Sequence, residues 1–234
     1  MPADRSTAEL SPLRLLDGID GGPPAPSELA VLMAPAGVGK SSCLVQMALD
    51  YLLNGRAVAH IVLDQPLHRV TRWYDHGLTE LAAAVGVEVD AINAVERVSE
   101  QRNIVAFAAG TFTTEVLRSR LEVLFPEPAR RPEIVIIDGY PIHKAKAEEI
   151  DEIKQISTDL GVMVWVSALG KGSSLKKGKT PAALSHLVSA ADFMLRIKAG
   201  DGISKLQLLK SRDTAYTKPL KIKLNPRTLL REKS

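Results

Sequence analysis

The sequence predicts an α/β fold: a mostly parallel, twisted sheet with helices on both faces and an antiparallel C-terminal hairpin. Three observations support this prediction. Short apolar runs alternate with helix-like segments along most of the chain. Residues 133–138 are apolar almost without alternation until the final aspartate, which is typical of a central parallel strand buried on both faces. Two strand-like segments then follow each other near the C-terminus with no helix between them, which predicts the hairpin.

The chain opens with a segment rich in glycine and proline, residues 1–28, which we expect to be an irregular lead-in. A single domain is then expected over residues 29–230. Its strands are predicted at residues 29–33, 57–63, 104–107, 133–138, 162–167, 193–197, 205–209 and 220–224. Its helices are predicted at residues 41–53, around 69–74, at 113–124, 143–160 and 181–191, with residues 78–102 helical in part. Asn54-Gly55 is a typical end for the first of these helices.

Composition narrows the class of protein. The chain of 234 residues is 45% hydrophobic and 24% charged, which is ordinary for a soluble globular domain. Aromatic residues make up only 4%, which argues against a surface that stacks nucleic-acid bases. No apolar run approaches twenty residues and the first ten residues are polar, so we expect a cytoplasmic protein. The lone Cys43 is interpreted as a small core residue.

Charge is distributed unevenly along the chain. Residues 1–170 hold 15 Lys and Arg against 23 Asp and Glu, a net charge of −8. Residues 171–234 hold 15 against 4, a net charge of +11. A solvated surface seldom separates charge this far, so we expect the C-terminal third to face a polyanion such as DNA.

The segment between the first strand and the first helix has the pattern of a phosphate-binding P-loop. It reads Ala34, Pro35, Ala36, Gly37, Val38, Gly39, Lys40, Ser41 and Ser42. Glycines let backbone N–H groups close around phosphate oxygens, and the helix N-terminus adds partial positive charge. Lys40 is predicted to bind the β- and γ-phosphates of ATP, and the Ser41 hydroxyl to bind Mg²⁺. The alternative is a chance Gly-Lys-Ser after a buried strand.

Polar residues end three of the predicted strands. Asp138 closes an apolar strand in the Walker B manner and is predicted to hold Mg²⁺ through water; the alternative is a turn cap. Asp64 is predicted to act as a general base for the attacking water, with a turn role before Gln65-Pro66 as an equal alternative. Ser167 is a candidate sensor of the γ-phosphate. Carboxyl ends of parallel strands meet in one crevice, which groups these side chains.

Two basic clusters lie in the C-terminal third. Lys210 and Arg212 flank Ser211 at the expected hairpin tip, from which they could reach a phosphate on a neighbouring subunit; the alternative is a solvated basic turn. Lys171, Lys176, Lys177 and Lys179 occupy a loop rich in glycine and serine, a candidate contact with a nucleic-acid backbone or simply a soluble loop. The five histidines show no metal-binding spacing.

With these residues in place, the chain resembles the RecA-like ATPases over most of residues 15–230. It is most similar to the branch of DnaB-type and RepA-type helicases, RadA-type repair ATPases and KaiC-like proteins. Residues 34–41 resemble the family's Walker A motif and residues 134–138 its Walker B motif. Gly21-Gly22 resembles the lead-in glycines, residues 164–169 the sensor strand, and residues 184–197 the segment entering the next strand. Residues 210–212 resemble the Lys-x-Arg finger pair of hexameric helicases.

The resemblance implies Mg²⁺-dependent ATP hydrolysis in an oligomer whose neighbouring subunits complete each site. It places a catalytic glutamate where this chain has Asp64, a glycine at Ala34 and a sensor glutamine at Ala168. The expected activity is that of a compact helicase, translocase or recombination ATPase on DNA. Two rival functions remain open: a KaiC-like regulatory ATPase that acts on proteins, and a nucleotide-dependent assembly protein with weak hydrolysis.

Overall fold

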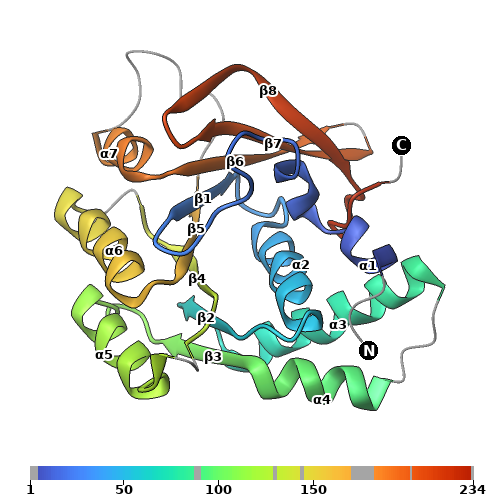
Figure 1. Cartoon of the computed structure of the whole chain (residues 1–234), viewed down its shortest axis with the longest axis horizontal. Helices are drawn as coiled ribbons and strands as arrows, with labels where there is room; N and C mark the ends of the chain where they lie inside the picture. The colour runs from blue at the N-terminus through green and yellow to red at the C-terminus, as the bar shows by residue number, and fades with distance from the viewer. Residues whose placement is uncertain are drawn as a thin grey trace.

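The computed structural model describes residues 5–86, 91–128, 131–142, 145–169, 182–200 and 202–232. Its strands join into one sheet in the order β3-β2-β4-β5-β1-β6-β7-β8 (Figure 1). They are β1 (Leu29–Ala34), β2 (Val58–Leu63), β3 (Arg102–Phe107), β4 (Ile134–Tyr140), β5 (Met163–Leu169), β6 (Phe193–Gly200), β7 (Ile203–Ser211) and β8 (Thr214–Leu224). Strands β1 to β6 run parallel, and β6, β7 and β8 pair antiparallel. The predicted fold class is confirmed.

Helices cover both faces of the sheet. They are α2 (Lys40–Leu53), α3 (Leu67–Val85), α4 (Ala91–Gln101), α5 (Thr114–Leu124), α6 (Ala147–Leu160) and α7 (Ala182–Ala190). Buried residues of α2, α3 and α4 form one hydrophobic core with one face of the sheet. Residues of α5, α6 and α7 form a second core on the other face (Figure 1). Because both faces are covered, β1 and β2 are buried along their whole length.

The lead-in is more ordered than its composition predicts. It contains α1 (Arg5–Glu9) and a short 3₁₀ helix, η1 (Pro12–Leu16), with Ser11 as N-cap. Leu13, Leu16 and Ile19 are buried in the core that includes α2. The expectation of an irregular segment held only for the turns after Leu16, because the leucines of η1 pack against β7 and β8.

The C-terminal hairpin is longer than predicted. The sequence indicated strands at residues 205–209 and 220–224, whereas β7 reaches Ser211 and β8 begins at Thr214. Cross-strand pairs such as Ser211 with Thr214 extend the ladder through polar residues that alternation alone did not mark. Lys210 therefore lies within a strand, and Arg212 lies in the two-residue turn. Helix α6 also begins later than predicted, at Ala147 rather than residue 143.

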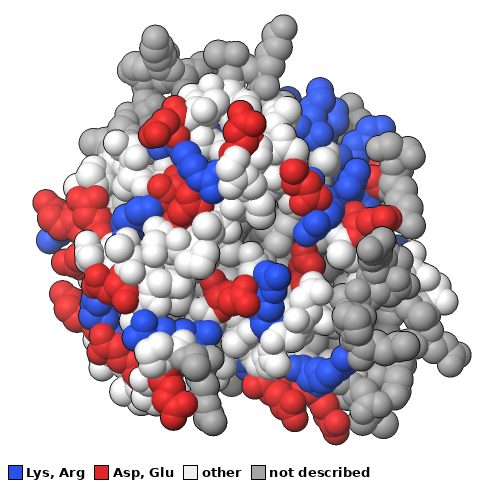
Figure 2. Space-filling model, viewed as in Figure 1, with Lys and Arg blue, Asp and Glu red and all other residues white. Residues whose placement is uncertain are grey.

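Charge follows the sheet order. In Figure 2, acidic side chains gather at the left, over α5 and α6, and basic side chains gather at the upper right, where β6 turns into β7. The uneven charge of the sequence is therefore also uneven in space. Within the described residues, no helix is both long enough and apolar enough to cross a membrane.

Candidate functional site: the phosphate-binding loop and its partners

The loop between β1 and α2 has the backbone of an anion-binding turn. Gly37 and Gly39 both have positive φ, at 75° and 91°, and Gly39 forms the N-cap of α2. The Lys40 Nζ donates hydrogen bonds to the carbonyl oxygens of Ala34 and Pro35, at 3.1 Å each. The lysine is thereby folded over the mouth of its own loop, next to the first exposed N–H groups of the helix.

The C-terminal tail packs against this loop, which the sequence did not predict. A Cβ at Gly39 would lie 3.2 Å from Leu229 Cδ2, so the site favours glycine on steric as well as conformational grounds. Gln46 Nε2 in α2 also donates to the Thr228 carbonyl at 3.0 Å. The tail therefore holds the first turns of α2 from behind. No local pattern marks this contact, because it joins segments that are far apart in the chain.

Asp138 lies near the end of β4, next to the loop, and is almost completely buried, with 1% of its surface exposed. Its Oδ1 accepts a hydrogen bond of 2.6 Å from Ser167 Oγ, which in turn accepts one of 2.8 Å from the Gly139 backbone N–H. Gly139 has φ +88°, and a Cβ there would meet the Leu63 carbonyl at 3.0 Å. The chain thus needs glycine to turn sharply after Asp138 and reach Ser167.

The other carboxylate oxygen of Asp138 is a buried acceptor with no partner among the described residues. Buried acceptors normally have one, so an unsatisfied oxygen marks a place for a ligand. The Ser41 hydroxyl, in the first turn of α2, has no hydrogen-bond partner in the described part of the chain. One carboxylate, one hydroxyl and room for water suit Mg²⁺, which keeps several waters and uses few protein ligands. These two residues fit the predicted metal.

Lys40 and Asp138 come from different elements yet belong to one site. Burial lowers the pKa of Lys40, and the negative charge of Asp138 acts in the opposite direction. The two side chains are therefore close enough to interact electrostatically at the carboxyl edge of the sheet. A site with one partly desolvated lysine and one buried carboxylate can bind a polyphosphate together with a divalent cation.

Asp64 lies at the same edge, because β2 pairs with β4 and Val62 stands opposite Asp138. It is exposed and has a left-handed backbone with φ 56°, and its N–H donates to the Phe107 carbonyl at 3.2 Å. Among the described residues, no side-chain partner holds its carboxylate. The structure therefore groups Asp64 with the site but leaves its carboxylate unpositioned.

Comparisons with known proteins bear on this arrangement. No protein-family model matches the sequence, and no curated protein matches it. Similar solved structures include the ATPase domain of a helicase. It matches with a TM-score of 0.66 and 14% identity over 93% of this chain and 87% of that chain. The crystal structure of the RadB recombinase matches with a TM-score of 0.63 and 16% identity, over 94% and 97%.

The fold is RecA-like. In this RecA-like sheet, Lys40, Asp138 and Ser167 come together as the strand order predicts, since β1, β5 and β4 are neighbours. The roles of these residues, and those of Asp64, Lys210 and Arg212, stay predictions. The lysines of residues 171–179 lie outside the described residues.

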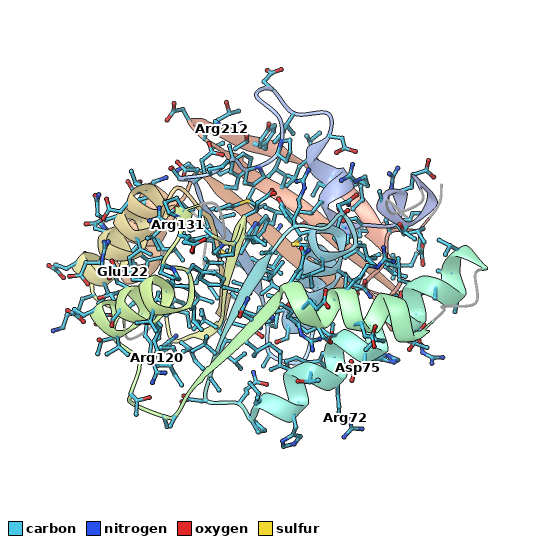
Figure 3. The ribbon with its side chains drawn as sticks, turned by 60° about the horizontal axis from the view of Figure 1, so that its bottom comes forward. Arg72, Asp75, Arg120, Glu122, Arg131 and Arg212 are labelled. Atoms are coloured by element: carbon cyan, nitrogen blue, oxygen red, sulfur yellow. The ribbon has the colours of Figure 1, made fainter. Side chains whose placement is uncertain are left out.

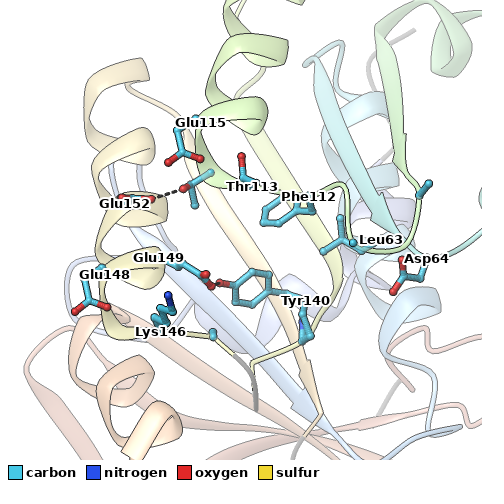
Figure 4. Close-up of a pocket in the computed structure, with 15 residues that line it drawn as sticks. Leu63, Asp64, Phe112, Thr113, Glu115, Tyr140, Lys146, Glu148, Glu149 and Glu152 are labelled. Atoms are coloured by element: carbon cyan, nitrogen blue, oxygen red, sulfur yellow. Dashed lines mark hydrogen bonds between the residues drawn. The ribbon is translucent and has the colours of Figure 1, made fainter.

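A larger cavity, of about 670 Å³, opens beside the site between α5 and α6 (Figure 4). Its charged lining residues are Asp64, Glu115, Glu148, Glu149, Glu152 and Lys146. Thr114 Oγ1 donates to Glu152 Oε2 and the Tyr140 hydroxyl donates to Glu149 Oε2, so two of the carboxylates are oriented by neighbours. An excess of carboxylates repels phosphate. We therefore place the nucleotide at the loop and not in this cavity.

Lys210 and Arg212 lie at the edge of the sheet opposite the phosphate-binding loop. Phe193 stands beside Ala30, near the start of β1, and Ser211 stands beside Phe193. Four residues of strand, about 13 Å, separate this level from the end of β1. Neither cation can reach the loop of its own chain; only the site of another copy lies within their geometry.

Both cations are engaged within their own chain. Lys210 Nζ donates to the carbonyls of Val188, Ser189 and Ala191, at 2.9, 3.3 and 2.6 Å, and so caps the C-terminal end of α7. Arg212 donates to both oxygens of Glu28, at 2.7 and 3.2 Å, and its guanidinium lies 4.8 Å from the centre of the Phe193 ring. The sequence indicated fingers free to reach a neighbour, whereas here both side chains hold the lead-in and α7.

Proposed function

We propose that the chain is a Mg²⁺-dependent ATPase, a RecA-like motor core that acts on DNA in an oligomer. The observation that carries this proposal is the meeting of Lys40 with Asp138, whose free oxygen is buried beside the loop. Two residues far apart in the sequence converge there on the position that a bound phosphate and a cation require. The RecA-like fold supports the same reaction.

The proposed roles follow from the geometry. Residues 34–42, with Lys40 among them, bind the phosphates, Ser41 and Asp138 hold Mg²⁺, and Ser167 fixes the orientation of Asp138. The cation would neutralise charge that develops on the transferred phosphoryl group. Asp64 is assigned to the attacking water, which it would receive at the same edge of the sheet.

The proposal includes an oligomer because each site is incomplete by itself. Lys40 is the only side-chain cation within residues 34–42, and Lys210 and Arg212 face the other way. A neighbouring copy that presents its hairpin turn would supply them. To do so, Arg212 must exchange Glu28 for phosphate, which ties assembly to a rearrangement of the lead-in.

DNA is the proposed polymer because the positive charge lies in the C-terminal third, over β6 to β8 (Figure 2). One observation favours the rival assembly protein with weak hydrolysis. Asp64 is exposed, one methylene shorter than glutamate, and has no described side-chain partner to aim it.

One experiment separates these functions. ATPase turnover is measured with and without single-stranded DNA over a series of salt concentrations. A motor predicts Mg²⁺-dependent turnover that DNA stimulates, with stimulation lost as salt rises. Slow turnover indifferent to DNA, in a protein that assembles on ATP addition, would instead support the assembly protein. A protein that binds ATP analogues but never hydrolyses ATP would contradict the ATPase assignment.

A further inference from the structure

The antiparallel extension formed by β6, β7 and β8 has two unlike faces. One face contributes Leu195, Ile197, Leu206, Leu208 and Leu224 to the core shared with α2. Alternate residues point to the other face. Near the turn from β6 into β7, this second face carries Lys198, Lys205, Lys221 and Lys223, all exposed. We call these four residues the lysine ladder.

The strand register places the ladder residues side by side. Lys198 pairs with Lys205 across β6 and β7, and Lys205 pairs with Lys223 across β7 and β8. Neighbouring strands lie about 4.8 Å apart, so three ammonium groups share one row about 10 Å wide. In the next row, Gln207 stands between Arg196 and Lys221.

Such a row is costly unless an anion covers it. Like charges directly opposite each other on a sheet destabilise the pairing. Among the described residues, none forms an ion pair with any of the four ladder lysines. Arg196 donates two hydrogen bonds to Gln207 Oε1, at 3.1 and 2.7 Å, which holds its guanidinium along the sheet beside the ladder.

The ladder also borders a hollow. A groove of about 420 Å³ is lined by Lys198, Lys205, Lys221, Gln207 and Ile203 with the neighbouring Ala199 and Gly200. None of these lining residues is aromatic, so the groove offers positive charge and backbone but no ring for a base. It suits the repeated phosphates of a strand, which carries one charge every 3.4 Å or so of axis, and not its bases.

We infer that the lysine ladder binds the phosphodiester backbone of single-stranded DNA without regard to sequence. The ladder is separate from the ATP site, because Ile197 faces α2 whereas Lys198 faces the opposite side of the sheet. It lies at the same edge as that site, since Arg196 stands beside Met33 at the end of β1. The inference rests on the proposed function only in its choice of DNA as the polyanion.

The test is equilibrium binding of a fluorescent oligothymidylate in the absence of nucleotide, over a series of salt concentrations. The variant carries Lys198→Gln, Lys205→Gln and Lys223→Gln. Each single-strand phosphate contact contributes about 0.7 to the slope of log affinity against log salt, so we expect the slope to fall by about 2. Affinity at low salt should fall by roughly tenfold or more. A Lys→Arg variant at the same positions should retain both.

The matched control removes the same charge elsewhere, through Arg69→Gln, Arg72→Gln and Arg120→Gln, on exposed parts of α3 and α5 (Figure 3). It should leave the slope within experimental error. Equal loss in both triple variants, or a parental slope in the ladder variant, would overturn the inference. So would stronger competition by an acidic protein than by DNA at equal charge.

The outcome is separable from that of the proposed function. A Lys40→Ala protein should lose nucleotide binding and still bind oligothymidylate through the ladder. Absence of ATPase activity with an intact ladder slope would sink the motor and leave the ladder standing. ATPase activity with binding that survives the loss of the ladder would do the reverse. Thermal unfolding of each variant checks that it is folded.

Discussion

The Ser167 hydroxyl donates a hydrogen bond of 2.6 Å to Asp138 Oδ1 and leaves Asp138 Oδ2 free at the carboxyl edge of the sheet. The serine therefore decides which carboxylate oxygen remains available for a metal. Groups that orient a metal ligand commonly contribute about 10- to 100-fold to affinity or activity.

Ser167→Ala is accordingly expected to raise the Mg²⁺ concentration that gives half-maximal ATPase activity by roughly 10-fold or more. The measurement is a Mg²⁺ titration at saturating ATP. Ser157→Ala is the matched control, because Ser157 is equally buried but hydrogen-bonds the Glu28 and Val162 carbonyls far from the site. An unchanged Mg²⁺ requirement in Ser167→Ala would show that the serine only fills space.

Lys40→Ala should abolish tight nucleotide binding, since it removes the only side-chain cation of residues 34–42. Its hydrogen bonds to the Ala34 and Pro35 carbonyls are partly exposed, so the loss of unfolding free energy should stay near 1 kcal/mol, on the order of one such bond. Calorimetric titration with a non-hydrolysable ATP analogue measures the effect. Arg72→Ala, an exposed charge on α3, serves as control. Parental affinity in folded Lys40→Ala would refute the loop assignment.

Asp138→Asn and Asp64→Asn should fail in different ways. The first removes the buried carboxylate assigned to Mg²⁺, so turnover and the Mg²⁺ dependence of binding both disappear. The second removes the base assigned to water, so turnover falls about 100-fold or more while nucleotide binding stays. Single-turnover hydrolysis and analogue binding separate the two. Parental turnover in Asp64→Asn would move the base elsewhere and favour the assembly protein.

Arg212→Ala tests assembly and structure together. Loss of the paired hydrogen bonds to Glu28 should cost about 1.5 to 3 kcal/mol of unfolding free energy. Glu28→Gln is the matched control, because it weakens the same pair and leaves the arginine. If Arg212 also acts on a neighbouring subunit, only Arg212→Ala loses turnover beyond what its stability explains. Mixing it with Lys40→Ala should then restore activity, because each mutant supplies the part that the other lacks. A dead mixture would confine Arg212 to its structural role.

His60 predicts a pH dependence of stability. It is fully buried in β2, its Nδ1 lies 2.9 Å from the Tyr74 hydroxyl, and burial lowers its pKa from 6.5 to about 4. Between those values the unfolded chain binds a proton that the folded chain does not, so stability falls as pH drops from 6.5 towards 4. The loss amounts to about 3 kcal/mol by the conversion of pKa shift into free energy.

Denaturant unfolding of the parent and of His60→Phe at several pH values between about 4 and 7 measures this difference. The phenylalanine variant should lose the part of the pH dependence that His60 contributes, whatever its absolute stability. His68 and His76 are exposed, so their replacement by phenylalanine is the control and should leave the slope unchanged. Identical slopes in the parent and in His60→Phe would contradict the prediction.

The sequence by itself determined the class of fold and the heart of the site. Continuous apolar runs marked β1, β4 and β5 because parallel strands are buried on both faces. Gly37, Gly39 and Lys40 marked the loop, since few other residues allow a backbone to enclose an anion. Asp138 was predictable because a lone carboxylate at the end of such a strand has few structural reasons to be there.

Only the tertiary structure decided which of these residues touch. Strand order sets Ser167 against Asp138, and cross-strand register sets Lys198, Lys205 and Lys223 in one row. The partners of Arg212 and of Gly39 come from distant parts of the chain. Local sequence specifies which face of a strand a residue occupies, because that depends on a period of two. Which strand lies beside it depends on the packing of the whole sheet, and no short window of sequence contains that information.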